Sequence, residues 1–274
     1  MNINGKRADL HIHSLYSDGA YNVDQLFALA LEKSIDLISI TDHDTIKSIP
    51  ELKRLSRQYG VEVVNGVELS ADFKGREVHI LNYAFEESSP ELNYYLNDFA
   101  LRRVERVRQT LDLLNGDGIE LTMEDVIVKN SPSQILGRPH IAAALVNKGY
   151  AKNMFDAFKR FIGDDKKFCI KKRNESVEFI IDLIKKSGGM SFIAHPGQNL
   201  RGNELSQLIK LGFDGIEVVH PAHDKYSTNY FIKVAEEHGL IQSGGSDFHG
   251  KNKQDFENFG NFYIPYYKLN SLLN

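Results

Sequence analysis

The chain has 274 residues, of which 26% are charged and 42% hydrophobic, enough for one large domain or for one domain that carries an insertion. Its formal net charge of −4 excludes a protein that holds duplex nucleic acid through an overall positive field. The single cysteine, Cys169, excludes a disulfide framework and a four-cysteine zinc site. The polar start of the chain and the lack of an apolar run of about 20 residues favour a cytoplasmic protein.

Short apolar segments alternate with amphipathic helical patterns along most of the chain. The patterns predict strands at 8–12, 36–41, 61–67, 77–85, 190–194, 215–220 and 240–244. They predict helices at 23–34, 46–59, 177–186, 205–211 and 228–238. This alternation indicates an α/β fold with a parallel sheet and external helices, and the number of strands favours a closed barrel.

The stretch 86–173 interrupts this alternation. Ser89-Pro90-Glu91 is typical of a helix start, apolar residues then recur at helical spacing, and Gly116 can end the helix. Two more helices are predicted at 139–147 and 154–162. We therefore expect a mostly helical inserted domain over 86–173 and a barrel domain made of 1–85 and 174–274.

Metal-ligand residue types recur at or near the ends of the predicted strands. Each of them alone has an ordinary structural explanation, such as a buried histidine with a hydrogen-bond partner. Together they favour one site, because the carboxyl ends of parallel strands meet at one rim of a barrel. Imidazole and carboxylate ligands suit manganese, iron or zinc, and nine of them are enough for two or three ions. The set is His11, His13, Asp18, His43, Glu68, His79, His195, Asp247 and His249.

The motifs that carry these residues resemble those of the polymerase and histidinol phosphatase (PHP) superfamily. They read D-L-H-x-H, S-D-G, T-D-H-D, G-x-E, A-H-P and S-D-F-H in chain order, and they extend over nearly the whole chain. Ile12 stands where the superfamily usually has Thr or Ser, at a position that should face away from the metals. The resemblance implies a distorted, TIM-like (β/α)7 barrel with three divalent ions. Mn²⁺ is the expected ion, with Fe, Zn or Mg as the other options.

The same resemblance implies a role for each ligand. His11, His13 and Asp247 would hold one ion, and Asp18, His43 and His249 a second. His79 and His195 would hold a third ion, to which Glu68 would bridge from the first. Asp18, His43 and His249 are also the candidates for direct contact with the substrate and the attacking water.

The insertion resembles that of nucleoside 3′,5′-bisphosphate phosphatases, a branch that includes 5′→3′ exoribonucleases acting on short RNA. There the inserted domain forms a lid whose basic residues bind substrate phosphates. The corresponding residues here are Arg102, Arg103, Arg106, Arg138, His140 and Lys166. The three arginines before Arg138 have a simpler explanation as a solvated helix face. Arg138-Pro139-His140 begins a predicted helix, where a phosphate finds unpaired backbone N–H groups.

One segment of the insertion departs from that branch. Residues 164–169 replace its usual Gly-Lys-x-x-Tyr run and keep only the lysine, Lys166. The departure leaves the substrate length and the base preference open.

The expected reaction is hydrolysis of the 3′-phosphate of a nucleoside 3′,5′-bisphosphate to give the 5′-nucleotide, with short single-stranded RNA as a further substrate. Neither duplex nucleic acid nor a membrane is an expected partner. Histidinol phosphate or another small phosphomonoester is the alternative substrate. A metal-binding but inactive regulatory module is the alternative from another class, and the complete ligand set argues against it. His220 and His223 either line the pocket, support a ligand from behind or lie in a plain loop, and His238 is expected to end a helix.

Overall fold

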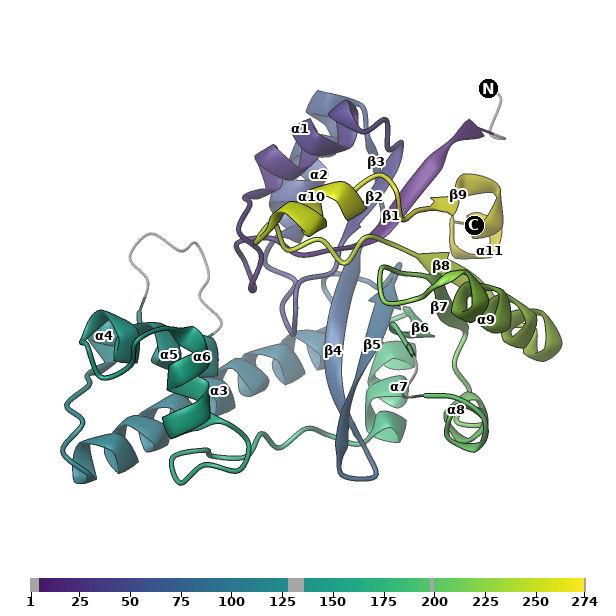
Figure 1. Cartoon of the computed structure of the whole chain (residues 1–274). Helices are drawn as coiled ribbons and strands as arrows, with labels where there is room; N and C mark the ends of the chain where they lie inside the picture. The colour runs from purple at the N-terminus through teal and green to yellow at the C-terminus, as the bar shows by residue number, and fades with distance from the viewer. Residues whose placement is uncertain (1–4, 128–135, 198–199, 274) are drawn as a thin grey trace. The chain divides into compact units, whose positions relative to one another are not determined.

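The computed structural model describes residues 5–127, 136–197 and 200–273, and the chain forms two compact units (Figure 1). One unit consists of Met1–Tyr94 and Asn174–Asn274, and the other of Tyr95–Arg173. No helix among the described residues is both long and apolar enough to cross a membrane.

The first unit contains a four-stranded sheet in the order β3-β2-β1-β9. Its first three strands are parallel, and β9 pairs with β1 in the antiparallel sense. The helices that follow β1 and β2 pack on each other and bury Leu26, Phe27 and Leu52 in a core shared with β2. The bounds are β1 Arg7–Ile12, β2 Leu37–Ile40, β3 Glu62–Val63, β9 Ile264–Pro265, α1 Val23–Glu32 and α2 Ile49–Tyr59.

A second sheet of the same unit has five strands in the order β4-β5-β6-β7-β8. Strands β6, β7 and β8 are parallel, with α7 packed on β4 and β6, and with α9 packed on β7 and β8 (Figure 1). The strand bounds are β4 Gly66–Phe73, β5 Arg76–Tyr83, β6 Met190–Ile193, β7 Gly215–Val219 and β8 Ile241–Gly244. The helix bounds are α7 Val177–Lys186, α8 Asn203–Ile209, α9 Lys225–His238, α10 Lys253–Asn258, η3 Tyr266–Leu269 and α11 Asn270–Leu273.

The expectation of a wholly parallel sheet was wrong at β4 and β5. These strands form an antiparallel hairpin, and β5 also pairs antiparallel with β6. The hairpin turns at Lys74 and Gly75, whose φ angles of 56° and 80° are those of a tight turn between antiparallel strands. The predicted strand 61–67 is in fact two strands, and Glu68 lies inside the second of them rather than after a strand end.

Two isolated bridges connect the two sheets. Ile12 bridges Phe248 beyond the end of β8, and His43 bridges Glu68 of β4. The fold of this unit is thus mixed α/β with two sheets in lateral contact. Their strands do not form one closed hydrogen-bonded ring within the part of the chain that the structure describes.

The second unit is helical in its described residues and has its own core. Leu111, Leu114, Leu145 and Ile162 are nearly or fully buried in that core. The helix predicted at 154–162 is an α-helical turn followed by a π-helical turn. The helices are α3 Pro90–Gly116, α4 Met123–Val126, α5 Arg138–Asn147, α6 Met154–Ala157 and η2 Phe158–Ile162, the first of which begins in the other unit.

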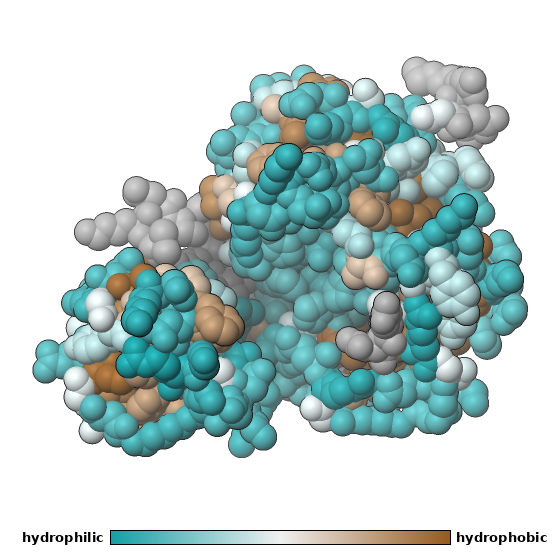
Figure 2. Space-filling model, in the orientation of Figure 1, coloured by the Kyte–Doolittle hydropathy of each residue, from teal (hydrophilic) through white to brown (hydrophobic). Residues whose placement is uncertain are grey.

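The surface carries hydrophilic side chains over most of the face drawn in Figure 2, with apolar residues in small separate groups. Exposed large apolar residues such as Tyr94, Leu101 and Phe155 are scattered along the chain. Isolated residues of this kind are normal on a protein surface and indicate no binding site by themselves.

Candidate metal centre

The first group of predicted ligands forms where β1 ends next to the loop after β8. His11 and His13 are both fully buried, two residues apart, and project to the same side. Nε2 of His11 lies 3.3 Å and Nε2 of His13 lies 3.1 Å from Oδ1 of Asp247. Asp247 reaches them from a backbone with a φ of 48°, next to a glycine-rich turn. Two imidazoles and a carboxylate therefore converge on one point.

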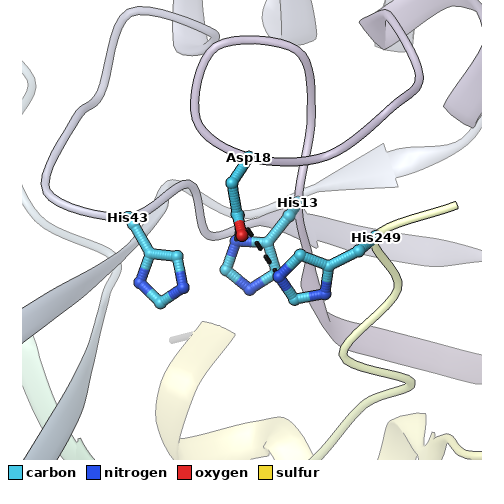
Figure 3. A group of neighbouring side chains, drawn as sticks. All are labelled: His13, Asp18, His43 and His249. Carbon is cyan, nitrogen blue, oxygen red and sulfur yellow. Dashed lines mark ion pairs between the residues drawn. The ribbon is translucent and has the colours of Figure 1, made fainter. Parts of the chain in front are cut away.

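A second group gathers His13, Asp18, His43 and His249, which point toward one another (Figure 3). Their ligand atoms all lie within 4.8 Å of one another, and Nε2 of His249 is 3.2 Å from Oδ1 of Asp18. The side chains of Asp18, His43 and His249 are 43%, 22% and 20% exposed. This edge of the cluster is consequently open to solvent, whereas the first group is mostly enclosed.

Glu68 lies between the groups and connects them. Its Oε1 is 2.8 Å from Nδ1 of His79 and 2.9 Å from Nε2 of His195. Its Oε2 is 3.2 Å from one ring nitrogen of each of three other imidazoles, those of His11, His13 and His43. One carboxylate cannot satisfy five imidazoles by hydrogen bonding alone, but its two oxygens are placed to bridge cations.

The electrostatics of the cluster show how strongly these groups are coupled. Burial disfavours the ionised form of Glu68, but the surrounding imidazoles hold its pKa well below the ordinary value. Burial opposes the charged form of His79 as well, and Glu68 nevertheless raises its pKa to about 10. Burial, His13 and His79 together lower the pKa of His43 to about 3. Closely spaced acids and bases of this kind are typical of a functional site.

One buried atom tests whether this donor set fits a metal ion. Nδ1 of His13 is inaccessible to solvent and has no hydrogen-bond partner among the described residues. A buried polar atom without a partner costs stability, and a cation bound in this cluster would give the ring of His13 a partner. The imidazoles and carboxylates of the cluster suit a divalent metal ion.

The acids that flank these histidines in sequence have a different task. Asp42 accepts hydrogen bonds from the backbone N–H and Oγ of Ser14, at 2.8 and 2.7 Å, and from Oγ of Ser17 at 2.6 Å. Asp44 accepts from the backbone N–H and Oγ of Ser70. These carboxylates fasten the loop after β1 and strand β4 on either side of His43.

Asp9 has a comparable role at the start of the first motif. Its Oδ1 accepts from the backbone N–H of Ser246 at 3.0 Å, which joins β1 to the turn that carries Asp247. Burial raises the pKa of Asp9 to about 7, although the hydrogen bonds from Ser246 and His11 work against this shift.

Glu217, a fully buried carboxylate inside β7, is not among the residues predicted from the sequence. Oε1 of Glu217 lies 3.0 Å from Nδ1 of His11, and Oε2 accepts the backbone N–H of His195 at 2.7 Å. No pattern in Gly215–Val219 distinguishes it from a glutamate that faces solvent. A charged residue inside a short, otherwise apolar strand was the one available signal.

The structure distinguishes the two histidines whose role was left open. Nε2 of His220 lies 3.3 Å from Oδ2 of Asp247, and its Nδ1 accepts the backbone N–H of Ala222. His223 is held by Val218 and Gly197 and touches no predicted ligand through these bonds. His220 therefore borders the cluster, whereas His223 braces the backbone around it. His238 ends α9, as predicted.

The basic residues predicted to bind substrate lie in the second unit. Three of them, Arg102, Arg103 and Arg106, line a pocket of about 690 Å³ between α3 and the segment 170–173. Lys171, Lys172 and Arg173 line the same pocket, and Glu105 is the one acid among its described lining residues. Nε of Arg103 donates to the carbonyl of Leu136 just before α5. The helix face that carries these three arginines, for which a solvated surface was the alternative explanation, is thus part of a strongly basic concavity.

The remaining three predicted residues have partners within the same unit. Arg138, at the first position of α5, donates to Asp164, to the carbonyl of Ile162 and to the sulfur of Cys169. Nδ1 of His140 accepts the backbone N–H of Gly137 at 3.2 Å, and Lys166 pairs with Asp165 at 2.8 Å. An anion at the start of α5 must therefore compete with Asp164 for Arg138.

Comparison with known proteins assigns this cluster to a family. The model of the PHP domain matches residues 9–190. The chain belongs to the PHP domain family. The match includes six of the nine clustered residues, from His11 to His79.

Several PHP relatives align with almost the whole chain. A phosphoribosyl 1,2-cyclic phosphate 1,2-diphosphodiesterase of Eggerthella lenta is 31% identical, over 89% of this chain and 94% of its own. A 5′-3′ exoribonuclease of Haemophilus influenzae is 31% identical, over 89% and 90%. A 3′,5′-nucleoside bisphosphate phosphatase of Chromobacterium violaceum is also 31% identical, over 88% and 86%. All three names describe hydrolysis of phosphoester bonds.

A solved structure agrees with this assignment. A protein of Bifidobacterium adolescentis, proposed to be a metal-dependent phosphoesterase, is 28% identical and superposes with a TM-score of 0.84. The alignment covers 98% of this chain and 96% of that protein. The chain is thus a hydrolase of the PHP phosphoesterase type, with a set of side chains that suits divalent cations.

Proposed function

We propose that this chain is a metal-dependent phosphoesterase that removes the 3′-phosphate of nucleoside 3′,5′-bisphosphates and leaves the 5′-nucleotide. The observation that carries the proposal is the arrangement around Glu68, whose two oxygens face two different sets of imidazoles. Such an arrangement fits several cations held close together, as in the multi-metal sites of phosphatases and nucleases. The name of the Chromobacterium relative supplies the substrate class.

The proposed centre holds three divalent ions, with Mn²⁺ as the expected ion; mixed imidazole and carboxylate ligands suit manganese, iron and zinc alike. His11, His13 and Asp247 would hold one ion, and Asp18, His43 and His249 a second. His79 and His195 would hold the third, with Glu68 between it and the first. When bound, the ions would supply an activated water and neutralise charge on the phosphate.

In this proposal, the buried side chains of the cluster fix its geometry, and the partly exposed ones meet the substrate. His11, His13 and Glu68 are buried and fix positions within the centre. Asp18 and His249 line its open edge, where a phosphate group enters and where they contact it directly. His43 reaches the same edge with a low pKa, so its ring is neutral and able to bind at physiological pH.

The pocket of the second unit is the proposed site for the other phosphate. Arg102, Arg103 and Arg106, together with Arg138, His140 and Lys166 nearby in the sequence, would supply the positive charge. A phosphate bound there contributes binding energy that orients the reacting group. This basic pocket supports a substrate with two phosphates, such as a bisphosphate or a short RNA.

The proposal extends to the architecture. The strands of 1–85 and 174–274 would form a distorted (β/α)7 barrel, with 86–173 as a helical inserted domain. The bridges from Ile12 to Phe248 and from His43 to Glu68 support the barrel, because they connect β1 with β8 and β2 with β4. The compactness of Tyr95–Arg173 supports an insertion.

The relatives favour two further substrates on the same site. The Eggerthella relative, which aligns over 94% of its own length, is named for a cyclic phosphodiester of ribose. The Haemophilus relative is named as an exoribonuclease. Both reactions need the same cations and an in-line attack on phosphorus, so the site alone does not separate them.

The test is release of phosphate from adenosine 3′,5′-bisphosphate by the Mn²⁺-loaded protein, with and without a chelator. We expect AMP and phosphate in equal amounts, and no reaction after chelation. Phosphoribosyl 1,2-cyclic phosphate, a short 5′-phosphorylated RNA and histidinol phosphate form the comparison panel. Faster turnover of one of these, with no AMP formed from the bisphosphate, would reject the proposed substrate and keep the reaction type.

A further inference from the structure

Glu217 is a buried carboxylate for which the proposed reaction has no use. It lies at the middle of β7 with no exposed surface, in the same unit as the metal cluster. A buried carboxylate is costly unless its charge is compensated and its oxygens are hydrogen-bonded. A glutamate side chain is ordinarily ionised at neutral pH, and an ionised carboxylate accepts hydrogen bonds only.

The two oxygens of Glu217 engage two different strands. Oε1 is 3.0 Å from Nδ1 of His11, the residue before the end of β1. Oε2 accepts the backbone N–H of His195, which follows β6, at 2.7 Å. Both histidines belong to the proposed ligand set, and Glu217 itself lies on the side of His11 away from Glu68.

The contact with His11 decides which ring nitrogen faces the cluster. Because the carboxylate can only accept, Nδ1 of His11 keeps its proton. Nε2 is the nitrogen left for a cation, and it lies 3.2 Å from Glu68 and 3.3 Å from Asp247. Ligand histidines are commonly oriented in this way by a carboxylate on their other nitrogen.

The contact with His195 fixes a backbone that is unfavourable for a non-glycine residue. His195 has a φ of 21°, outside the broadly allowed regions. The hydrogen bond of its N–H to Glu217 helps to hold this conformation, in which the ring reaches Oε1 of Glu68 at 2.9 Å.

Glu217 is less suited to be a ligand itself. It forms a possible ligand group with His11 and His220. However, Nδ1 of His220 accepts the N–H of Ala222, so the proton of a neutral His220 is on Nε2, the nitrogen nearest Asp247. The nitrogen of His11 on this side is protonated as well.

We propose that Glu217 is a positioning residue of the metal centre, whose buried carboxylate sets the ring of His11 and the main chain of His195 at once. It thereby connects the predicted ligand His11 of β1 with the predicted ligand His195, which follows β6. The inference rests on the proposed cation site but not on the proposed substrate, because it is tested by metal binding alone.

The test is titration of the metal-free protein with Mn²⁺. Binding is measured by calorimetry and by the electron paramagnetic resonance signal of the Mn²⁺ that remains free. In Glu217→Gln, the side-chain NH₂ group must face either Nδ1–H of His11 or the backbone N–H of His195. Whichever way the amide turns, two donors then face each other in one of the two contacts. We expect Mn²⁺ binding to weaken about 10- to 100-fold, with the unfolding midpoint of the metal-free protein lowered no more than in the control.

The matched control is Asp214→Asn. Asp214 precedes β7 and accepts the backbone N–H of Ser191 in β6 at 2.8 Å. This bond connects the regions of β6 and β7, as the bond from His195 to Glu217 does, but it involves no predicted ligand. The same carboxylate-to-amide change there should leave Mn²⁺ affinity unchanged. Equal affinity in Glu217→Gln and the wild type would overturn the proposal, as would equal losses of affinity in both variants. Loss of one equivalent of Mn²⁺ at unchanged affinity for the rest would make Glu217 a ligand, and would also overturn it.

A second measurement covers the case in which Glu217→Gln does not fold. In the zinc-loaded wild-type protein, nitrogen–proton correlation spectra of the histidine rings report which nitrogen of His11 carries the proton. A proton on Nδ1 is the expected result. A proton on Nε2 would contradict the proposed role.

Discussion

Neighbouring residues in one short motif have different roles in this protein: two support the backbone, and the one between them faces the metal-ligand cluster. In Thr41-Asp42-His43-Asp44, the two acids accept hydrogen bonds from serines of other segments, and the histidine between them turns to the cluster. The acids fasten the loop after β1 and strand β4, so the ring of His43 is held without being packed into the core. A ligand on such a support can be removed without loss of the fold.

His43→Ala should abolish turnover and leave the protein folded. The ring is 22% exposed, and its loss removes a predicted ligand of the open edge rather than a core contact. We expect kcat to fall at least about 100-fold, as for loss of a group that stabilises the transition state, with unchanged circular dichroism. His238→Ala, at the exposed end of α9, is the matched control and should be fully active. Full activity of His43→Ala would remove this residue from the centre.

Arg138→Ala should mainly weaken binding of substrates with two phosphates. The arginine is already paired with Asp164, so an incoming phosphate exchanges one partner for another. We expect KM for adenosine 3′,5′-bisphosphate to rise about 10-fold, with little change for 3′-AMP, as is typical when one charged hydrogen bond is lost. Arg108→Ala, on α3 beside Glu105, is the control. An equal loss on both substrates would indicate a structural role for Arg138.

The elements converge on the cluster because two strands approach each other closely. A Cβ added to Gly245, just after β8, would lie 2.4 Å from the backbone nitrogen of His11 and 2.6 Å from its Cβ. The same atom would lie 2.8 Å from Oδ1 of Asp9. The absence of a side chain at this position therefore allows the turn with Ser246 and Asp247 to lie against β1.

Gly245→Ala should damage both stability and metal binding, because β1 must move to admit the methyl group. We expect a loss of about 1–3 kcal/mol in the free energy of unfolding and weaker Mn²⁺ binding. Gly116→Ala, in the last turn of α3 with no atom near the new Cβ, should change stability by less than about 1 kcal/mol. Denaturant unfolding and Mn²⁺ titration check both. Wild-type Mn²⁺ affinity in Gly245→Ala would show that the close approach is not required.

At the scale of the whole molecule, the two units have separate cores and unequal charge. The first unit concentrates imidazoles and carboxylates in one cluster, and the second has a compact apolar core of its own. Bound cations stabilise only the folded form of the unit that binds them. Metal removal should accordingly affect one unit and leave the other unchanged.

Scanning calorimetry in Mn²⁺ and in a chelator should show this difference. At a Mn²⁺ concentration 100 times the dissociation constant, stability rises by about 2.7 kcal/mol, so the transition of the first unit should shift upward. Leu145→Ala identifies the other transition, because it removes a fully buried side chain from the second core at a cost of about 2–5 kcal/mol. A transition lowered by Leu145→Ala that also shifts with Mn²⁺ would contradict the separation.

The sequence by itself predicted most strands and helices, a helical stretch that includes Tyr95–Arg173, and nine histidines and acids that the structure brings close together. Hydrophobic periodicity indicates which residues are buried, and ligand-type residues that recur at several strand ends indicate one shared site. The tertiary structure alone decided the antiparallel hairpin of β4 and β5, which puts Glu68 inside a strand. It also decided the role of Glu217 and the pairing of Arg138 with Asp164. The physical reason is that spacing gives the direction of a side chain along its own strand or helix, whereas its partners come from segments far away in the chain.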